Sequence, residues 1–195
     1  MEDYVILALF GLLLLRRTYR MTQGVPAGAG RLVVLPAFYV AIYVAELAGT
    51  WVASVGTGRM EWTYVAFAAD ALMLAVGTWL SYRITSQHVH VYQPAVGGPW
   101  YYRLRPLLPV LYVVLFFVRA IIGTVVIGIV PFGFPTSAQF DSISTTALVA
   151  LYVVDALWGL TTGFLIGRSS AVYRAWKNAE RSPPAPPAAP PPLPG

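Results

Sequence analysis

The chain contains no cysteine and few charged residues. Among its 195 residues are 13 Lys or Arg and 8 Asp or Glu, so charged side chains make up 11% of the chain, against about 25% in soluble domains. Without cysteine the chain forms no disulfide, holds no Cys-ligated zinc or iron–sulfur cluster and attaches no haem covalently. A soluble domain of this size needs more surface charge to stay dissolved. These absences exclude a soluble enzyme.

Hydrophobic residues are abundant instead, at 57% of the chain, with a mean hydropathy of +0.65. They form five apolar stretches, which must be helical because lipid cannot satisfy exposed peptide groups. The sequence predicts an all-α polytopic bundle in one domain, residues 1–181. Its predicted transmembrane spans are residues 4–18, 32–55, 62–82, 107–130 and 143–166.

The first span is the shortest. Its apolar part, Tyr4 to Leu15, covers about 18 Å of a hydrocarbon core of about 30 Å, and snorkelling by Arg16 and Arg17 can extend it. A cleaved signal peptide is the alternative, but such peptides begin with basic residues, whereas here acids precede the apolar run and the basic cluster follows it. The pattern favours an anchor with its N-terminus outside. Whether this segment fully spans stays open.

Basic residues gather on one side of the predicted spans. Eleven of the 13 follow the first, third and fifth spans, whereas the opposite loops hold Arg59 and four acids. Short loops rich in Lys and Arg remain cytoplasmic, so we predict the N-terminus outside and the C-terminus inside. Topology and anionic lipid explain the net charge of +5 better than a nucleic-acid partner does.

Two segments have their own character. Between residues 84 and 106, the alternation from Thr85 to Tyr92 and the turn residues Val96-Gly97-Gly98 predict a small cytoplasmic hairpin. Residues 182–195 are rich in proline, which predicts a disordered cytoplasmic tail. The preceding residues 169–181 are basic and suggest a short amphipathic helix on the membrane surface.

Four charged residues lie near the centres of the predicted spans: Glu46, Asp70, Arg119 and Asp155. A charge exposed to lipid there costs about 2.5–3.5 kcal/mol, so we expect these side chains to face one another inside the bundle. One arginine cannot neutralise three carboxylates, so at least one acid is expected to be protonated, hydrated or bound to a cation. A structural tie between helices and a proton or ligand site both remain open.

Small residues accompany two of these acids. Gly159, Gly163 and Gly167 follow Asp155 at steps of four, which places them on one helix face and allows another backbone to approach closely. Glu46 likewise has small residues three, four and seven positions later in its span. We therefore expect these acids to lie on helix-packing faces.

Candidates for ligand binding are few, and no cofactor is expected. His88 and His90 would share a face of a strand as weak metal ligands, but a third ligand is not evident near them. The arginines that follow the first span are expected to contact lipid phosphate; they are Arg16, Arg17, Arg20 and Arg31.

The order of these features resembles a known family. A first helix ending in Arg16-Arg17 is followed by Gly28-Ala29-Gly30-Arg31 and Leu35-Pro36, and later helices carry Phe117-Val118-Arg119 and Gly167-Arg168. Over about residues 1–175 the chain resembles the CcdC-like family of small prokaryotic integral membrane proteins, named from neighbourhood with cytochrome c maturation genes. The resemblance implies a multi-pass protein of the plasma membrane. The family name implies association with those genes rather than an activity.

Composition and charge placement favour an accessory or assembly component of a membrane complex, without enzymatic activity. Its expected partners are the lipid bilayer and either another membrane protein or a second copy of the chain. The alternative is a small proton-linked transporter or channel, in which an intramembrane carboxylate carries the proton and Arg119 tunes its affinity. A lipid-modifying enzyme needs a catalytic set at headgroup depth, for which His88 with Arg103 or Arg105 is a poor candidate.

Overall fold

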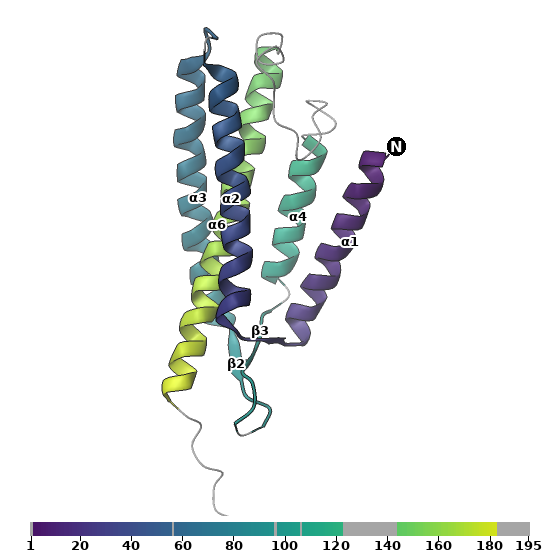
Figure 1. Ribbon diagram of the computed structural model, residues 1–195, viewed down its shortest axis with the longest axis vertical. Helices are drawn as coiled ribbons and strands as arrows, with labels where there is room; N and C mark the ends of the chain where they lie inside the picture. The colour runs from purple at the N-terminus through teal and green to yellow at the C-terminus, as the bar shows by residue number, and fades with distance from the viewer. Residues whose placement is uncertain (1, 56, 96, 106, 123–143, 183–195) are drawn as a thin grey trace, which may run out of the picture.

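The computed structural model describes the chain except at residues 1, 56, 96, 106, 123–143 and 183–195 (Figure 1). The tail after Ser182 and residues 123–130 of the predicted fourth span thus lie outside the described residues. The described elements are α1 Glu2–Gln23, β1 Val25–Pro26, α2 Ala29–Ser54, α3 Met60–His88, β2 His90–Tyr92, β3 Tyr101–Arg103, α4 Leu107–Ile121 and α6 Thr145–Arg181.

The helices run lengthwise beside one another, and the strands lie near one end of the molecule (Figure 1). α2, α3 and α6 stand together as a three-helix core. α4, and beyond it α1, lie on the side of α2 that faces away from α3. We call the end that carries the strands the sheet end.

Three described helices, α2, α3 and α6, are long and apolar enough to cross a membrane, by length and composition. They have 26, 29 and 37 residues, or about 39 to 56 Å at about 1.5 Å per residue, which exceeds a hydrocarbon core of about 30 Å. Large apolar side chains such as Val34, Val52 and Val65 point outward from α2 and α3. The protein is therefore mostly helical, with three helices compatible with a place in a membrane.

Buried side chains form three clusters along the bundle. The central cluster joins α2, α4 and α6 and contains Tyr39, Tyr43, Val113, Phe116, Trp158 and Leu165. A second cluster lies at the sheet end and contains Met21, Leu32, Tyr102, Leu104 and Val172. A third, with Ala53, Leu148 and Leu151, packs α6 against the end of α2. α6 contributes to all three, so this helix is the common surface on which the described fold is built.

The strands form an antiparallel sheet in the order β1-β3-β2. β2 pairs with β3, with Val91 opposite Tyr102, so the hairpin predicted between the third and fourth helices is present. β1 was not predicted; it adds Val25 opposite the same Tyr102. Gly97, between β2 and β3, has φ 78°, a left-handed conformation that glycine adopts readily. The sheet thereby ties the α1–α2 linker to the α3–α4 linker.

Two predictions about helix ends are wrong. α3 continues to His88, and the Val89 N–H donates to the Thr85 carbonyl, so the two histidines do not share a strand. Thr85 is fully buried, so the last turn of α3 packs inside the protein. The segment 169–181 is not a separate surface helix, because it continues α6. The reason is packing, since Val172 is buried in the sheet-end cluster.

Candidate functional site

The carboxylate cluster consists of Glu46 on α2, Asp70 on α3 and Asp155 on α6. Each helix of the three-helix core thus contributes one acid. Asp70 is 1% exposed, whereas Glu46 and Asp155 are partly exposed. The structure places Glu46 within electrostatic range of Asp70, and Tyr43 within range of both Asp70 and Asp155. Residues from three parts of the sequence therefore meet around one buried carboxyl group.

A seam of glycines brings α6 against α3, from the level of Asp70 toward the sheet end. A methyl group added at Gly159 would lie 2.8 Å from the Asp70 carbonyl oxygen and 3.2 Å from the Tyr43 hydroxyl. Added at Gly163, it would overlap the Leu74 carbonyl oxygen, and at Gly167 the Thr78 carbonyl oxygen. Each glycine thus permits a backbone contact that alanine would obstruct.

α3 contributes to the same seam from the other side. Gly77 lies against the backbone of Leu160, where an added methyl group would overlap the carbonyl oxygen. Near the sheet end, the Ser81 hydroxyl donates to the Phe164 carbonyl over 2.7 Å. Close packing and this interhelical hydrogen bond together hold α3 and α6 in one register along the seam.

The Asp70 carboxyl group is buried without a hydrogen bond. Neither of its oxygens has a hydrogen-bond partner among the described residues. An ionised carboxyl group in such a place is costly unless it is paired, and a second carboxylate nearby adds repulsion. A bound proton, a cation, a water molecule or a basic side chain would each offset this cost at the carboxylate cluster.

Arg119 is the basic residue predicted to meet these acids, but its side chain lies outside the described part of the structure. Its backbone lies on α4, three residues after Phe116. Phe116 is 1% exposed and packs in the central cluster with Tyr43 and Trp158. The described contacts thus bring α4 to the same region of the core, and the predicted pairing of Arg119 stays a prediction.

A metal centre is not indicated by the described residues. Among them, no group of three or more His, Asp or Glu side chains is arranged to hold a metal ion. This finding includes the carboxylate cluster. It also includes the two histidines, because His88 ends α3 and His90 begins β2.

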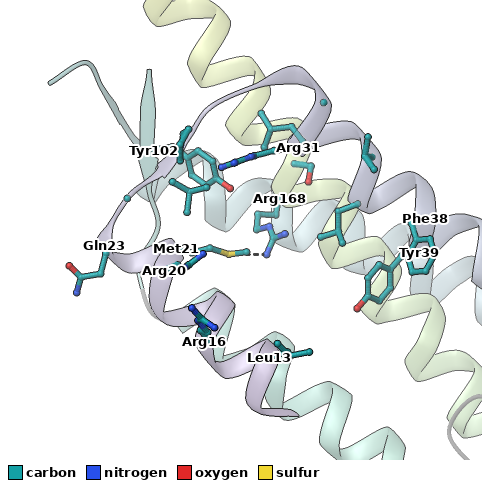
Figure 2. Close-up of a pocket in the computed structure, with 18 residues that line it drawn as sticks. Leu13, Arg16, Arg20, Met21, Gln23, Arg31, Phe38, Tyr39, Tyr102 and Arg168 are labelled. Atoms are coloured by element: carbon teal, nitrogen blue, oxygen red, sulfur yellow. Dashed lines mark hydrogen bonds between the residues drawn. The ribbon is translucent and has the colours of Figure 1, made fainter. Parts of the chain in front are cut away.

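A second polar region lies at the sheet end, where α1, α2 and α6 surround a cavity of about 1230 Å³ (Figure 2). Three of the arginines predicted to contact phosphate line it, Arg16, Arg20 and Arg31. The side chain of Arg17 lies outside the described part.

Arg168 also lines this cavity, and sequence reasoning did not assign it to the site. It is 8% exposed, and its Nη1 donates to the Met21 sulfur over 3.4 Å. Its position one helical turn from Leu165 and from Val172, on the same apolar face of α6, could have indicated that it faces the bundle interior. We call the space bounded by these four arginines the arginine cavity.

Comparison of the chain with protein-family models, with curated proteins and with solved structures finds no match.

Proposed function

We propose that the chain is a five-helix protein of the plasma membrane, with α1 and α4 as further spans and with its N-terminus outside. The charge placement supports this orientation, because Arg16, Arg31 and Arg168 lie at the sheet end, whereas Arg59 joins α2 and α3 at the other end. Such a distribution is typical of a sheet end that faces the cytoplasm.

The protein acts, in this proposal, as a non-enzymatic accessory or assembly component of a membrane complex, and it is a CcdC-like protein by sequence resemblance. The observation that carries the accessory role is the glycine seam around Asp70. The backbones of α3 and α6 are in close contact at Gly159 and Gly163, so the two helices cannot separate without losing the packing of the core. A fixed core suits a protein that holds partners better than one that opens to each side in turn.

The carboxylate cluster serves as the polar contact in this role. Glu46 and Asp155 are partly exposed, so a basic or hydrogen-bonding group on a neighbouring helix can reach them. Arg119 is the proposed partner within the chain, and a second membrane protein or a second copy supplies the rest. Polar contacts inside a bilayer contribute about 1–2 kcal/mol and favour one arrangement of helices over others.

Isolation of the full chain in mild detergent, followed by mass analysis, tests this role. We expect one membrane protein, or a second copy, to be retained at a fixed stoichiometry. Asp155→Asn should weaken that retention, whereas Glu180→Gln should not, since Glu180 pairs with Lys177 on the exposed end of α6 over 2.8 Å. Equal retention by both variants would show that the midplane acid has no part in it.

A proton-linked transporter is the second candidate, and Asp70 favours it. Its carboxyl group is buried, makes no hydrogen bond to the described residues and lies close to another acid. Such an arrangement is common where protons bind and leave. In this alternative Asp70 carries the proton and Arg119 tunes its affinity.

Proton flux separates the two candidates. The purified chain in liposomes that contain a pH-sensitive dye should show no flux above empty liposomes if it is an accessory protein. Flux that is abolished by Asp70→Asn would establish the transporter and overturn the accessory role. Glu180→Gln, which changes an exposed acid near the end of α6, is the control for loss of one acid.

A further inference from the structure

The arginine cavity brings together basic side chains from separate parts of the chain. Arg16 and Arg20 are one turn apart on α1, so they lie on the same face of that helix. Arg31 comes from the first turn of α2, and Arg168 reaches toward α1 from α6 (Figure 2). Three helices thus direct positive charge at one space.

The described lining of this cavity is basic. It contains these four arginines and no Asp or Glu. Guanidinium groups bind phosphate with two parallel hydrogen bonds, and several of them around one space attract an anion strongly. Like charges around one space repel one another, and an anion within the space offsets that repulsion. The electrostatics therefore indicate a phosphate or similar anion.

Another part of the cavity wall is apolar and exposed at the side of the bundle. Leu13 on α1 and Val34 and Phe38 on α2 line it, and their side chains are 60%, 66% and 59% exposed. The wall is thus continuous with the outer surface of the helices, where acyl chains would lie in a bilayer. A volume of about 1230 Å³ also exceeds what a phosphate ion alone would fill.

We propose that the arginine cavity binds one anionic phospholipid, with its phosphate among the arginines and an acyl chain along Leu13, Val34 and Phe38. This differs from ordinary anchoring at the membrane surface, because Arg168 is 8% exposed and lies on the inner side of the cavity. A headgroup that contacts Arg168 must enter between α1 and α6. The lipid then links α1 to the three-helix core.

This inference goes beyond the accessory role and requires only that the chain is embedded in a membrane. Native mass spectrometry of the full chain in detergent tests it by counting bound molecules. The probes are phosphatidylglycerol, phosphatidylcholine with the same acyl chains, and glycerol 3-phosphate, which has the phosphate without a chain. We expect one phosphatidylglycerol per chain and much weaker retention of the other two.

Matched variants show whether the cavity is the site. Arg20→Gln with Arg31→Gln removes two exposed arginines from the lining, and Arg83→Gln with Arg181→Gln removes two exposed arginines outside it. Both pairs lower the net charge by the same amount. We expect the first pair to weaken phosphatidylglycerol binding by at least about tenfold, as loss of charge-assisted hydrogen bonds does, and the second pair to leave it within about twofold.

Three results would overturn the proposal. An equal loss with both variant pairs would show general attraction of lipid to a basic surface. Binding of glycerol 3-phosphate as tight as that of phosphatidylglycerol would assign the cavity to a soluble phosphate. Retention of phosphatidylcholine equal to that of phosphatidylglycerol would show that the arginines select no anion. Should the first pair fail to fold, Arg16→Gln provides the same comparison on the exposed face of α1.

Discussion

Alanine in place of Gly163 should loosen the contact between α3 and α6. The added methyl group would overlap the Leu74 carbonyl oxygen and lie 2.8 Å from the Thr78 nitrogen. Ordinary contact begins at 3.4 Å, so the backbone of α3 must move away by about 0.6 Å or more. Both atoms belong to a helix backbone, so neither can rotate aside as a side-chain end could.

The magnitude follows from two opposing effects. Inserting a methyl group into a packed interior costs about 1–3 kcal/mol, and replacing glycine by alanine within a helix recovers up to about 1 kcal/mol. We therefore expect Gly163→Ala to lower the free energy of unfolding by about 1–2 kcal/mol. Gly30→Ala is the matched control, since Gly30 also lies in a helix but an added methyl group there meets nothing within 4 Å.

Unfolding of the purified chain in mixed micelles with increasing dodecyl sulfate, followed by far-ultraviolet circular dichroism, measures both variants. The expected order of stability is Gly30→Ala at or slightly above the wild type, and Gly163→Ala below it. If Gly163→Ala proved as stable as Gly30→Ala, the helices would not be in backbone contact at this position, and the argument for a fixed core would fail.

Four further predictions concern other parts of the fold. Trp158→Ala removes a side chain that is 1% exposed in the central cluster and should cost about 3–5 kcal/mol of stability in the same unfolding assay. Asp70→Asn replaces a buried carboxyl group that makes no hydrogen bond to the described residues and should leave the chain as stable or more stable; a large loss would reveal a partner for the carboxylate. Ser144→Ala deletes the side chain that accepts from the Ala147 N–H over 3.2 Å at the start of α6 and should cost about 1 kcal/mol. Protease added outside sealed, right-side-out vesicles should leave the 182–195 tail intact, and cleavage there would refute the proposed orientation.

Helix positions could be predicted because lipid imposes one solution on long apolar segments. The helical starts at residue 107 and near 145 lie close to the predicted limits, and α2 and α3 cover the second and third spans. Where each helix stops was less predictable. α3 and α6 run past their apolar segments, where Thr85 is fully buried and Val172 is buried in the sheet-end cluster. This burial is a tertiary effect that hydropathy does not contain.

The site was predictable in part for a similar reason. Acids near span centres must avoid lipid, which is why Glu46, Asp70 and Asp155 could be singled out from the sequence. The arginine cavity could not be assembled in this way, since it depends on how α1 approaches α6. That approach involves the packing of Met21 with Val172 and the pairing of β1, a two-residue strand too short to predict, with β3 about 76 positions later.

The place of α6 in the chain also bears on biosynthesis. This helix supplies the surface on which α2, α3 and α4 pack, yet it is made after all three. Until it emerges from the ribosome and inserts, Asp70 and Gly77 have no covering backbone. In the proposed membrane protein, the early helices would therefore expose these groups to lipid, and completion of the last helix would end that exposure.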